Sequence, residues 1–192
     1  MTSFWIRLSC CAFLVCGGCD LFHTRDPELP TQGSSSFVTP TTYDKVIRNL
    51  RFSIEDKNLN NYLSCFVDTL LRPYEYNAAE DARRGFPDVV SQWNLESEER
   101  SFRNLKEATG AAPALTIPDV PPIYVSTDSV LYELSYTLHY PHNRSGIPLT
   151  VRGVVQLSLL TDGKRWSIYR WRDSKTTTDS TWSYLKAAFS GS

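Results

Sequence analysis

Two kinds of hydrophobic periodicity divide this chain. In the first half, apolar residues recur three and four positions apart, which predicts helices from Tyr43 to about Lys57 and from Glu96 to Thr109. In the second half, apolar and polar residues alternate over residues 130–140 and 149–159, which predicts two long strands with one buried face. Helices followed by strands indicate an α+β fold, with helices packed on one face of a curled antiparallel sheet.

Shorter elements are expected between these segments. A short second helix should carry Tyr62 and Phe66, which lie four residues apart, and another short helix fits residues 87–93. The chain around residues 70–76 should be extended, since Pro73 disfavours a helix. Residues 114–125 have four prolines in or near them, which is typical of irregular chain or an edge strand.

A clear turn signal follows the second predicted strand. Residues 161–164 read Thr-Asp-Gly-Lys, and Asp-Gly accepts the positive φ angles of a tight hairpin. A third strand at 166–172 would complete a three-stranded antiparallel meander. A last helix should follow, with Trp182, Leu185 and Phe189 on one face.

The first 18 residues have the pattern of a secretory signal. Arg7 precedes an apolar stretch at residues 8–15, and the small residues Gly17 and Gly18 follow it. The apolar stretch is too short to cross a bilayer core of about 30 Å as a helix. A signal peptide at residues 1–18 is therefore favoured over a membrane-spanning anchor.

Residues 15–19, Val-Cys-Gly-Gly-Cys, resemble the lipobox of bacterial lipoproteins. In that family a small residue precedes an invariant cysteine, whose thiol receives diacylglycerol before the leader is removed; Gly18 and Cys19 match. Cys16 departs from the pattern, which prefers Leu at that position, and this leaves processing by an ordinary signal peptidase as an alternative. The resemblance implies lipid attachment at Cys19 and a protein held at a membrane of the bacterial cell envelope, on its periplasmic side or at the cell surface.

Cysteine usage agrees with this interpretation. Cys10, Cys11 and Cys16 would leave with the leader and Cys19 would carry lipid, so Cys65 alone remains and no disulfide can form within the mature chain. Cys65 lies in an apolar stretch and is interpreted as a packing residue rather than a nucleophile.

Two regions are expected after the leader. Residues 19–42 are rich in Pro, Thr, Ser and Gly without apolar periodicity, which predicts a flexible tether. Residues 43–192 should form a single α+β domain.

Part of that domain, residues 43–173, is similar to the cone-shaped nuclear-transport-factor-2-like superfamily, also called SnoaL-like. The resemblance rests on the opening helix, on Leu-Asn-Asn-Tyr at residues 59–62, and on Trp-Ser-Ile-Tyr-Arg-Trp-Arg-Asp at residues 166–173. It implies a curled sheet and helices that enclose a cone. The superfamily includes isomerases, epoxide hydrolases, dehydratases and domains without activity.

Charge and histidine content exclude several partners. Twenty basic and 21 acidic residues give a net charge of −1, and no basic run is present, so nucleic-acid binding is not expected. His23, His139 and His142 are scattered and have no metal-site spacing, and no glycine-rich phosphate loop exists. We therefore expect neither a metal nor a cofactor.

Aromatic residues, at 12% of the chain, are the remaining candidates for a site. Tyr132, Tyr136, Trp166 and Trp171 fall on the predicted inner face, where they would either line a pocket for a small apolar ligand or fill the core; the filled core is favoured. No Asp or Glu shares the inward alternation of residues 130–140, and Glu133 should face solvent.

The leading hypothesis is therefore a non-enzymatic envelope lipoprotein that binds a protein partner or a small apolar molecule. The outer face of the sheet would serve association, as a homodimer or with another envelope protein. The alternative is a small cofactor-independent hydrolase or isomerase that uses a residue inside the cone, such as Asp68 or Asp88.

Overall fold

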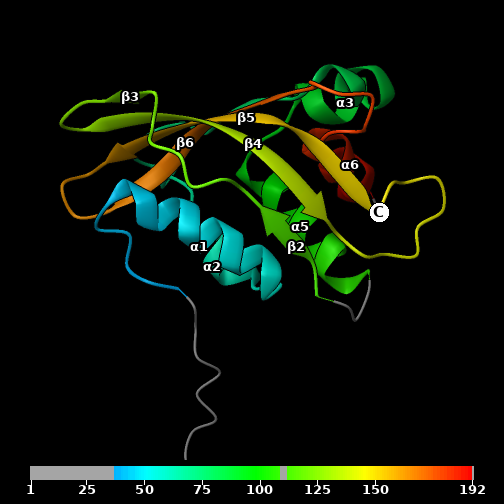
Figure 1. Ribbon diagram of the computed structural model, residues 1–192, viewed down its shortest axis with the longest axis horizontal. Coiled ribbons are helices and arrows are strands. Elements are labelled where there is room, and N and C mark those ends of the chain that lie inside the picture. The colour runs from blue at the N-terminus through cyan, green and yellow to red at the C-terminus, as the bar shows by residue number, and fades with distance from the viewer. Residues whose placement is uncertain (1–36, 109–111, 192) are drawn as a thin grey trace, which may run out of the picture. The chain divides into compact units, whose positions relative to one another are not determined.

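The structure is a computed structural model that describes residues 37–108 and 112–191. Its elements are α1 (Tyr43–Glu55), α2 (Leu59–Leu63), β1 (Glu75–Asn77), α3 (Glu80–Gly85), α4 (Pro87–Ser91), α5 (Leu95–Glu107), β2 (Ala114–Thr116), β3 (Tyr124–Val125), β4 (Ser129–His139), β5 (Thr150–Thr161), β6 (Trp166–Ser174) and α6 (Trp182–Ser190). In Figure 1, α1, α2 and α5 lie on the same side of the long strands β4, β5 and β6. The predicted α+β class is confirmed.

The sheet is mixed rather than purely antiparallel. Its order is β1-β6-β5-β4-β2, and β3 also pairs with β4. The predicted meander of β4, β5 and β6 is antiparallel throughout, but β1 pairs with β6 in parallel. Sequence periodicity missed this pair because β1 has only three residues and its partner strand is distant in sequence, with Glu75 opposite Arg170.

The alternation predicted for the long strands is present. Inward side chains of β4 are buried and meet inward side chains of β5, with Leu134 opposite Val155 and Tyr132 opposite Leu157. A register shift at Ser158 and Leu159 of β5 introduces a bulge against β6, and bulges bend a sheet. The Asp-Gly hairpin also forms, with Gly163 at φ +86°.

The first described residues are bonded to the domain. The side chain of Asn49 on α1 accepts from the Val38 amide at 3.1 Å and donates to the Val38 carbonyl at 2.6 Å. The Trp166 amide of β6 donates to the Pro40 carbonyl at 2.8 Å. The contacts of the domain therefore begin before Tyr43, within the last residues of the predicted tether. The rest of that tether and the predicted signal peptide lie outside the described residues.

The spacing of Tyr62 and Phe66 predicted that both lie in the second helix, but Phe66 lies outside it. The helix ends at Leu63, and the chain then runs beside β6: the Val67 amide donates to the Ile168 carbonyl at 2.9 Å, and the Ile168 amide to the Cys65 carbonyl at 2.8 Å. Backbone hydrogen bonds to the outer edge of β6 thus replace those that one further turn of α2 would have made.

Helix α3 was not predicted. Ala82 is its one buried residue, so it has almost no apolar periodicity to detect. Among the described residues, no helix combines the length and apolar character needed to cross a membrane.

Candidate functional site: a cleft beside the first helix

A cleft of about 290 Å³ opens between α1 and the chain that follows β2. Tyr132 and Leu134 of β4 form its buried floor. The walls come from two segments and consist of Asp44, Ile47, Arg48 and Arg51 on α1, and Ile117, Pro118, Asp119 and Val120 after β2.

The cleft exists because the edge of β4 is only partly covered. β2 pairs with β4 as far as Thr116 opposite Thr137, and pairing resumes in β3 with Tyr124 opposite Leu131. Between them the chain contains three prolines, at 118, 121 and 122, which lack the amide hydrogen that a strand ladder requires. This segment leaves the sheet, and the cleft opens between it and α1, over the β4 side chains.

The floor supplies one polar group, the Tyr132 hydroxyl. Burial, together with smaller contributions from the nearby Tyr43, Asp44 and Asp119, raises the pKa of Tyr132 to about 12. The hydroxyl is therefore protonated at neutral pH and can donate a hydrogen bond into the cleft. It is poorly suited to act as a general base.

The α1 wall carries two guanidinium groups. Arg48 is exposed and Arg51 is half-buried. Among the described residues neither forms an ion pair. Together with Asp44 and Asp119 they give the apolar floor a charged rim, an arrangement common in small-molecule sites.

A second polar centre lies inside the domain. The Glu98 carboxylate of α5 is fully buried and accepts four hydrogen bonds: from the hydroxyls of Tyr62 at 2.7 Å and Tyr74 at 2.8 Å, from Trp93 Nε1 at 2.9 Å, and from Lys186 Nζ at 2.9 Å. Five segments of the chain meet at this one side chain.

Lys186 of α6 is the cation of that centre. Its ammonium lies 3.6 Å from the ring centroid of Trp171 and 5.1 Å from that of Tyr76. Burial lowers the pKa of Lys186, whereas the Glu98 carboxylate acts in the opposite direction. An ion pair enclosed by rings holds α5 and α6 together.

Asp173 at the end of β6 is a second buried carboxylate. It accepts from the Tyr136 hydroxyl at 2.9 Å and from the Ser183 amide at 2.7 Å, in the first turn of α6. The Trp182 amide donates to the same Tyr136 oxygen at 2.7 Å. Burial raises the pKa of Asp173, and these hydrogen bonds lower it.

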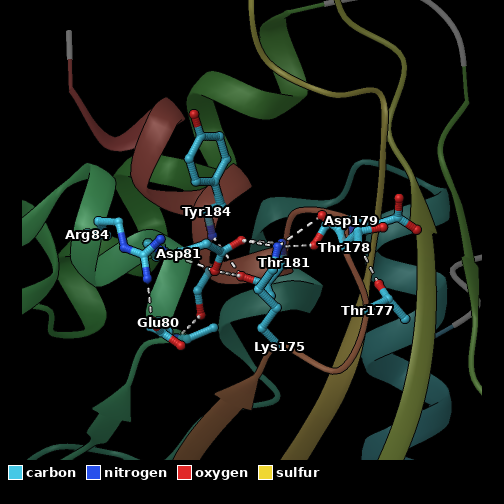
Figure 2. Close-up of polar contacts among 12 residues, drawn as sticks. Glu80, Asp81, Arg84, Lys175, Thr177, Thr178, Asp179, Thr181 and Tyr184 are labelled. Atoms are coloured by element: carbon cyan, nitrogen blue, oxygen red, sulfur yellow. Dashed lines mark hydrogen bonds and ion pairs between the residues drawn. The ribbon is translucent and has the colours of Figure 1, made fainter.

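A third polar cluster, centred on Asp81 and nearer the surface than the other two, holds the link between β6 and α6 (Figure 2). Asp81 of α3 accepts from the Thr181 amide at 2.8 Å and from the Thr181 hydroxyl at 2.7 Å, and the Lys175 ammonium lies 3.9 Å away. Lys175 in turn donates to the carbonyls of Thr178 and Asp179. These contacts close the loop and position the start of α6.

The structure separates the four aromatic residues proposed to line a pocket. Tyr132 lines the cleft. Tyr136 bonds Asp173, Trp171 is fully buried against Lys186, and Trp166 packs edge-on against Tyr43 at 5.5 Å. Packed rings occupy the interior around them, which agrees with the expectation of a filled core.

Other sequence expectations can be placed as well. Asp68 and Asp88 are both exposed, so neither is the hidden carboxylate of the enzyme alternative. Glu133 is exposed and accepts from Gln156, as expected. Cys65 is buried and burial raises its pKa to about 12, which confirms a packing role.

Sequence reasoning missed the two buried carboxylates. Glu98 lies four residues before the buried Phe102, on the apolar face of α5, and Asp173 lies two residues after the buried Trp171. These spacings, four residues in a helix and two in a strand, place both carboxylates on buried faces and were the signal available in the sequence. Among the described residues, no group of three or more His, Cys, Asp or Glu side chains is arranged to hold a metal ion.

The order of the strands, the helices α1, α2 and α5 on one side of them and the open, bent sheet match the nuclear-transport-factor-2-like (NTF2-like) cone fold. No protein-family model matches the chain, and no curated protein matches it in sequence. Solved structures do match in fold, at sequence identities that indicate the fold alone.

Three of these structures illustrate the similarity. A protein of Novosphingobium aromaticivorans, provisionally named an aromatic ring hydroxylase, has a TM-score of 0.56 and 11% identity, covering 74% of this chain and 92% of its own. A second from the same organism, provisionally named a scytalone dehydratase, has a TM-score of 0.54 and 9% identity, covering 71% and 83%. A provisionally named dehydratase of the NTF2-like family from Streptomyces avermitilis has a TM-score of 0.51 and 12% identity, covering 69% and 92%.

Proposed function

We propose that this protein is an exported lipoprotein, anchored through Cys19, whose NTF2-like domain binds a small, largely apolar molecule without transforming it. The observation that carries the binding role is the cleft floored by Tyr132 and Leu134. Its volume lies near the lower end of the range of about 300–1,000 Å³ for ligand sites, which suits a single ring or a short apolar chain.

The chemistry of the cleft favours binding over catalysis. Tyr132 stays protonated at neutral pH and can orient a ligand by donating one hydrogen bond. Asp44 and Asp119 do line the cleft, but both are exposed at its rim rather than enclosed on its floor. The two buried carboxylates, Glu98 and Asp173, do not line the cleft and are already engaged by donors of the protein itself. A proton-transfer group must lie within about 3 Å of the proton it moves, directly or through one water.

Ligand binding can be tested with 2-phenylethanol as the probe and amide chemical shifts as the readout. We expect shifts in α1 and in residues 117–120. Val120→Trp should abolish them by filling the cleft, and Val125→Trp is the matched control, because Val125 is an exposed valine outside the lining. Shifts that are confined to other regions, or that persist in Val120→Trp, would refute the proposed site.

The lipid anchor has a separate test in cell fractions. Because Cys19 supplies the thiol that receives diacylglycerol, Cys19→Ser should block acylation and move the protein from the membrane fraction to the soluble fraction of the envelope. Cys16→Ser is the matched control and should leave the protein on the membrane. A Cys19→Ser variant that remains membrane-bound and still matures would contradict the anchor.

An enzymatic function is the second candidate. It is favoured by the provisional names of two structural neighbours, both dehydratases, and by the protonated Tyr132 hydroxyl, which is placed to act as a hydrogen-bond donor or acid. A hydrolase, isomerase or dehydratase activity that Tyr132→Phe abolishes, while ligand affinity is retained, would establish it in place of simple binding. Association through the outer face of the sheet stays a separate prediction.

A further inference from the structure

Two adjacent leucines project into solvent from the loop between α2 and β1. Leu70 is 92% exposed and Leu71 is 67% exposed, more than any other large hydrophobic side chain of the described residues. The loop is nevertheless well bonded: Asp68 Oδ1 accepts from the Leu70 amide at 2.9 Å, and the Asp68 carbonyl accepts from the Leu71 amide at 3.0 Å. The backbone therefore presents both leucines outward in a defined conformation.

This loop lies at the outer edge of β6. Just before the loop, Cys65 and Val67 bond Ile168 across that edge. Within the loop, the Arg72 guanidinium stacks 3.9 Å from the ring centroid of Tyr169. Just after the loop, β1 pairs with the same strand, with Glu75 opposite Arg170.

The N-terminal part of the described chain reaches the same edge. The Trp166 amide, at the start of β6, donates to the Pro40 carbonyl, and the neighbouring Ile168 amide donates to Cys65 on that side of the strand. In Figure 1 the blue start of the described chain lies near the start of the orange strand β6. The strand rises about 3.3 Å per residue, so Pro40 and the loop contact β6 roughly 10 Å apart.

From this juxtaposition we infer that the outer edge of β6 faces the membrane, with Leu70 and Leu71 inserted at the bilayer interface. The inference rests on the proposed lipid at Cys19. Phe37 is 18 residues beyond that cysteine, and 18 residues span at most about 65 Å. The chain from the anchor enters the domain at this edge, and it is long enough for the edge to reach the bilayer.

The groups around the leucines fit a lipid surface. Arg72 follows them directly, and Lys164 and Arg165 are exposed at the start of β6, where the Arg165 guanidinium bonds the Ser64 carbonyl. The Asp68 carboxylate, two residues before Leu70, is also exposed, but it accepts a hydrogen bond from the Leu70 amide of the same loop. An apolar tip with cations beside it can bury its hydrocarbon in the acyl region and leave its charges among lipid phosphates. A two-residue tip on a protruding loop suits insertion into a bilayer better than packing into a protein groove.

The test uses the full chain, acylated in a bacterial host and reconstituted into vesicles of phosphatidylethanolamine and phosphatidylglycerol. Leu70→Cys is labelled with a polarity-sensitive fluorophore, because Cys65 is buried and Cys19 carries lipid. Leu149→Cys is the matched control: Leu149 is also an exposed leucine, but it lies at the opposite end of β5 from the β5–β6 hairpin. Spin labels on the lipid chains serve as quenchers.

We expect a blue-shifted emission at position 70 and severalfold stronger quenching by the lipid-borne spin labels than at position 149. Equal, water-like emission at both positions in anchored protein would overturn the inference while leaving the lipid anchor intact. A blue shift without quenching by lipid would also overturn it, since a protein partner would then cover the leucines. Fractionation of Cys19→Ser separately decides the anchor.

Discussion

The ion pair between Glu98 and Lys186 makes a strong prediction about stability. Lys186→Met keeps the length and most of the volume of the side chain, so it creates little cavity, but it removes the ammonium. Glu98 is then a buried carboxylate without a cation. Breaking a buried pair in this way costs about 3–5 kcal/mol. We expect a loss of this size in the free energy of unfolding.

The same site makes the double variant informative. For an isolated buried pair, replacing both partners with apolar residues is often nearly neutral. Here the hydroxyls of Tyr62 and Tyr74 and the Trp93 indole also donate to Glu98. Each of these donors, if left without a partner, costs about 1–3 kcal/mol. Glu98→Met combined with Lys186→Met should therefore stay strongly destabilised.

The assay is urea unfolding of the domain, followed by tryptophan fluorescence, with Lys164→Met as control. Lys164 is exposed and forms no ion pair among the described residues, so its loss should cost no more than about 1 kcal/mol. A Lys186→Met variant as stable as the wild type would refute the argument. A double variant that regains wild-type stability would show that the three ring donors contribute nothing.

Three further predictions follow from the described contacts. In Glu98→Gln the pKa of Lys186 should fall further, since its carboxylate partner is gone. The unfolded chain then binds more protons than the folded one, so the free energy of unfolding should rise as pH increases toward the unfolded lysine pKa. A urea midpoint that does not change with pH would contradict this. Gly153→Ala would place a Cβ 2.7 Å from the Ser174 carbonyl and from the Tyr136 hydroxyl, so it should cost about 1–3 kcal/mol in thermal unfolding, whereas Gly191→Ala, with nothing within 4 Å, should be neutral. Asp81→Ala leaves the Thr181 amide and hydroxyl without their acceptor and should lower the melting temperature, while Glu80→Ala, which removes only an exposed ion pair, should not.

Local pattern alone determined the main elements of this protein. The meander of β4, β5 and β6, the Asp-Gly hairpin and helices α1, α5 and α6 were all predictable, because their residues repeat with the period of one secondary structure. The α+β class followed from their order along the chain. Cys65 and Glu133 were also placed correctly, since neighbouring residues decide which face each one occupies.

Tertiary structure decided the rest, because it depends on partners that are distant in sequence. The parallel β1–β6 pair and the chain at Cys65–Val67 form only because β6 has a free edge. Glu98 accepts its four hydrogen bonds only in the packed fold, where α2, the segment before β1, the residues before α5 and α6 all reach it. None of these segments shares a periodic pattern with α5. The cleft arises in the same way, from the gap that β2 and β3 leave along β4. Periodicity shows which side of an element is buried, but only the packed fold shows which atoms meet there.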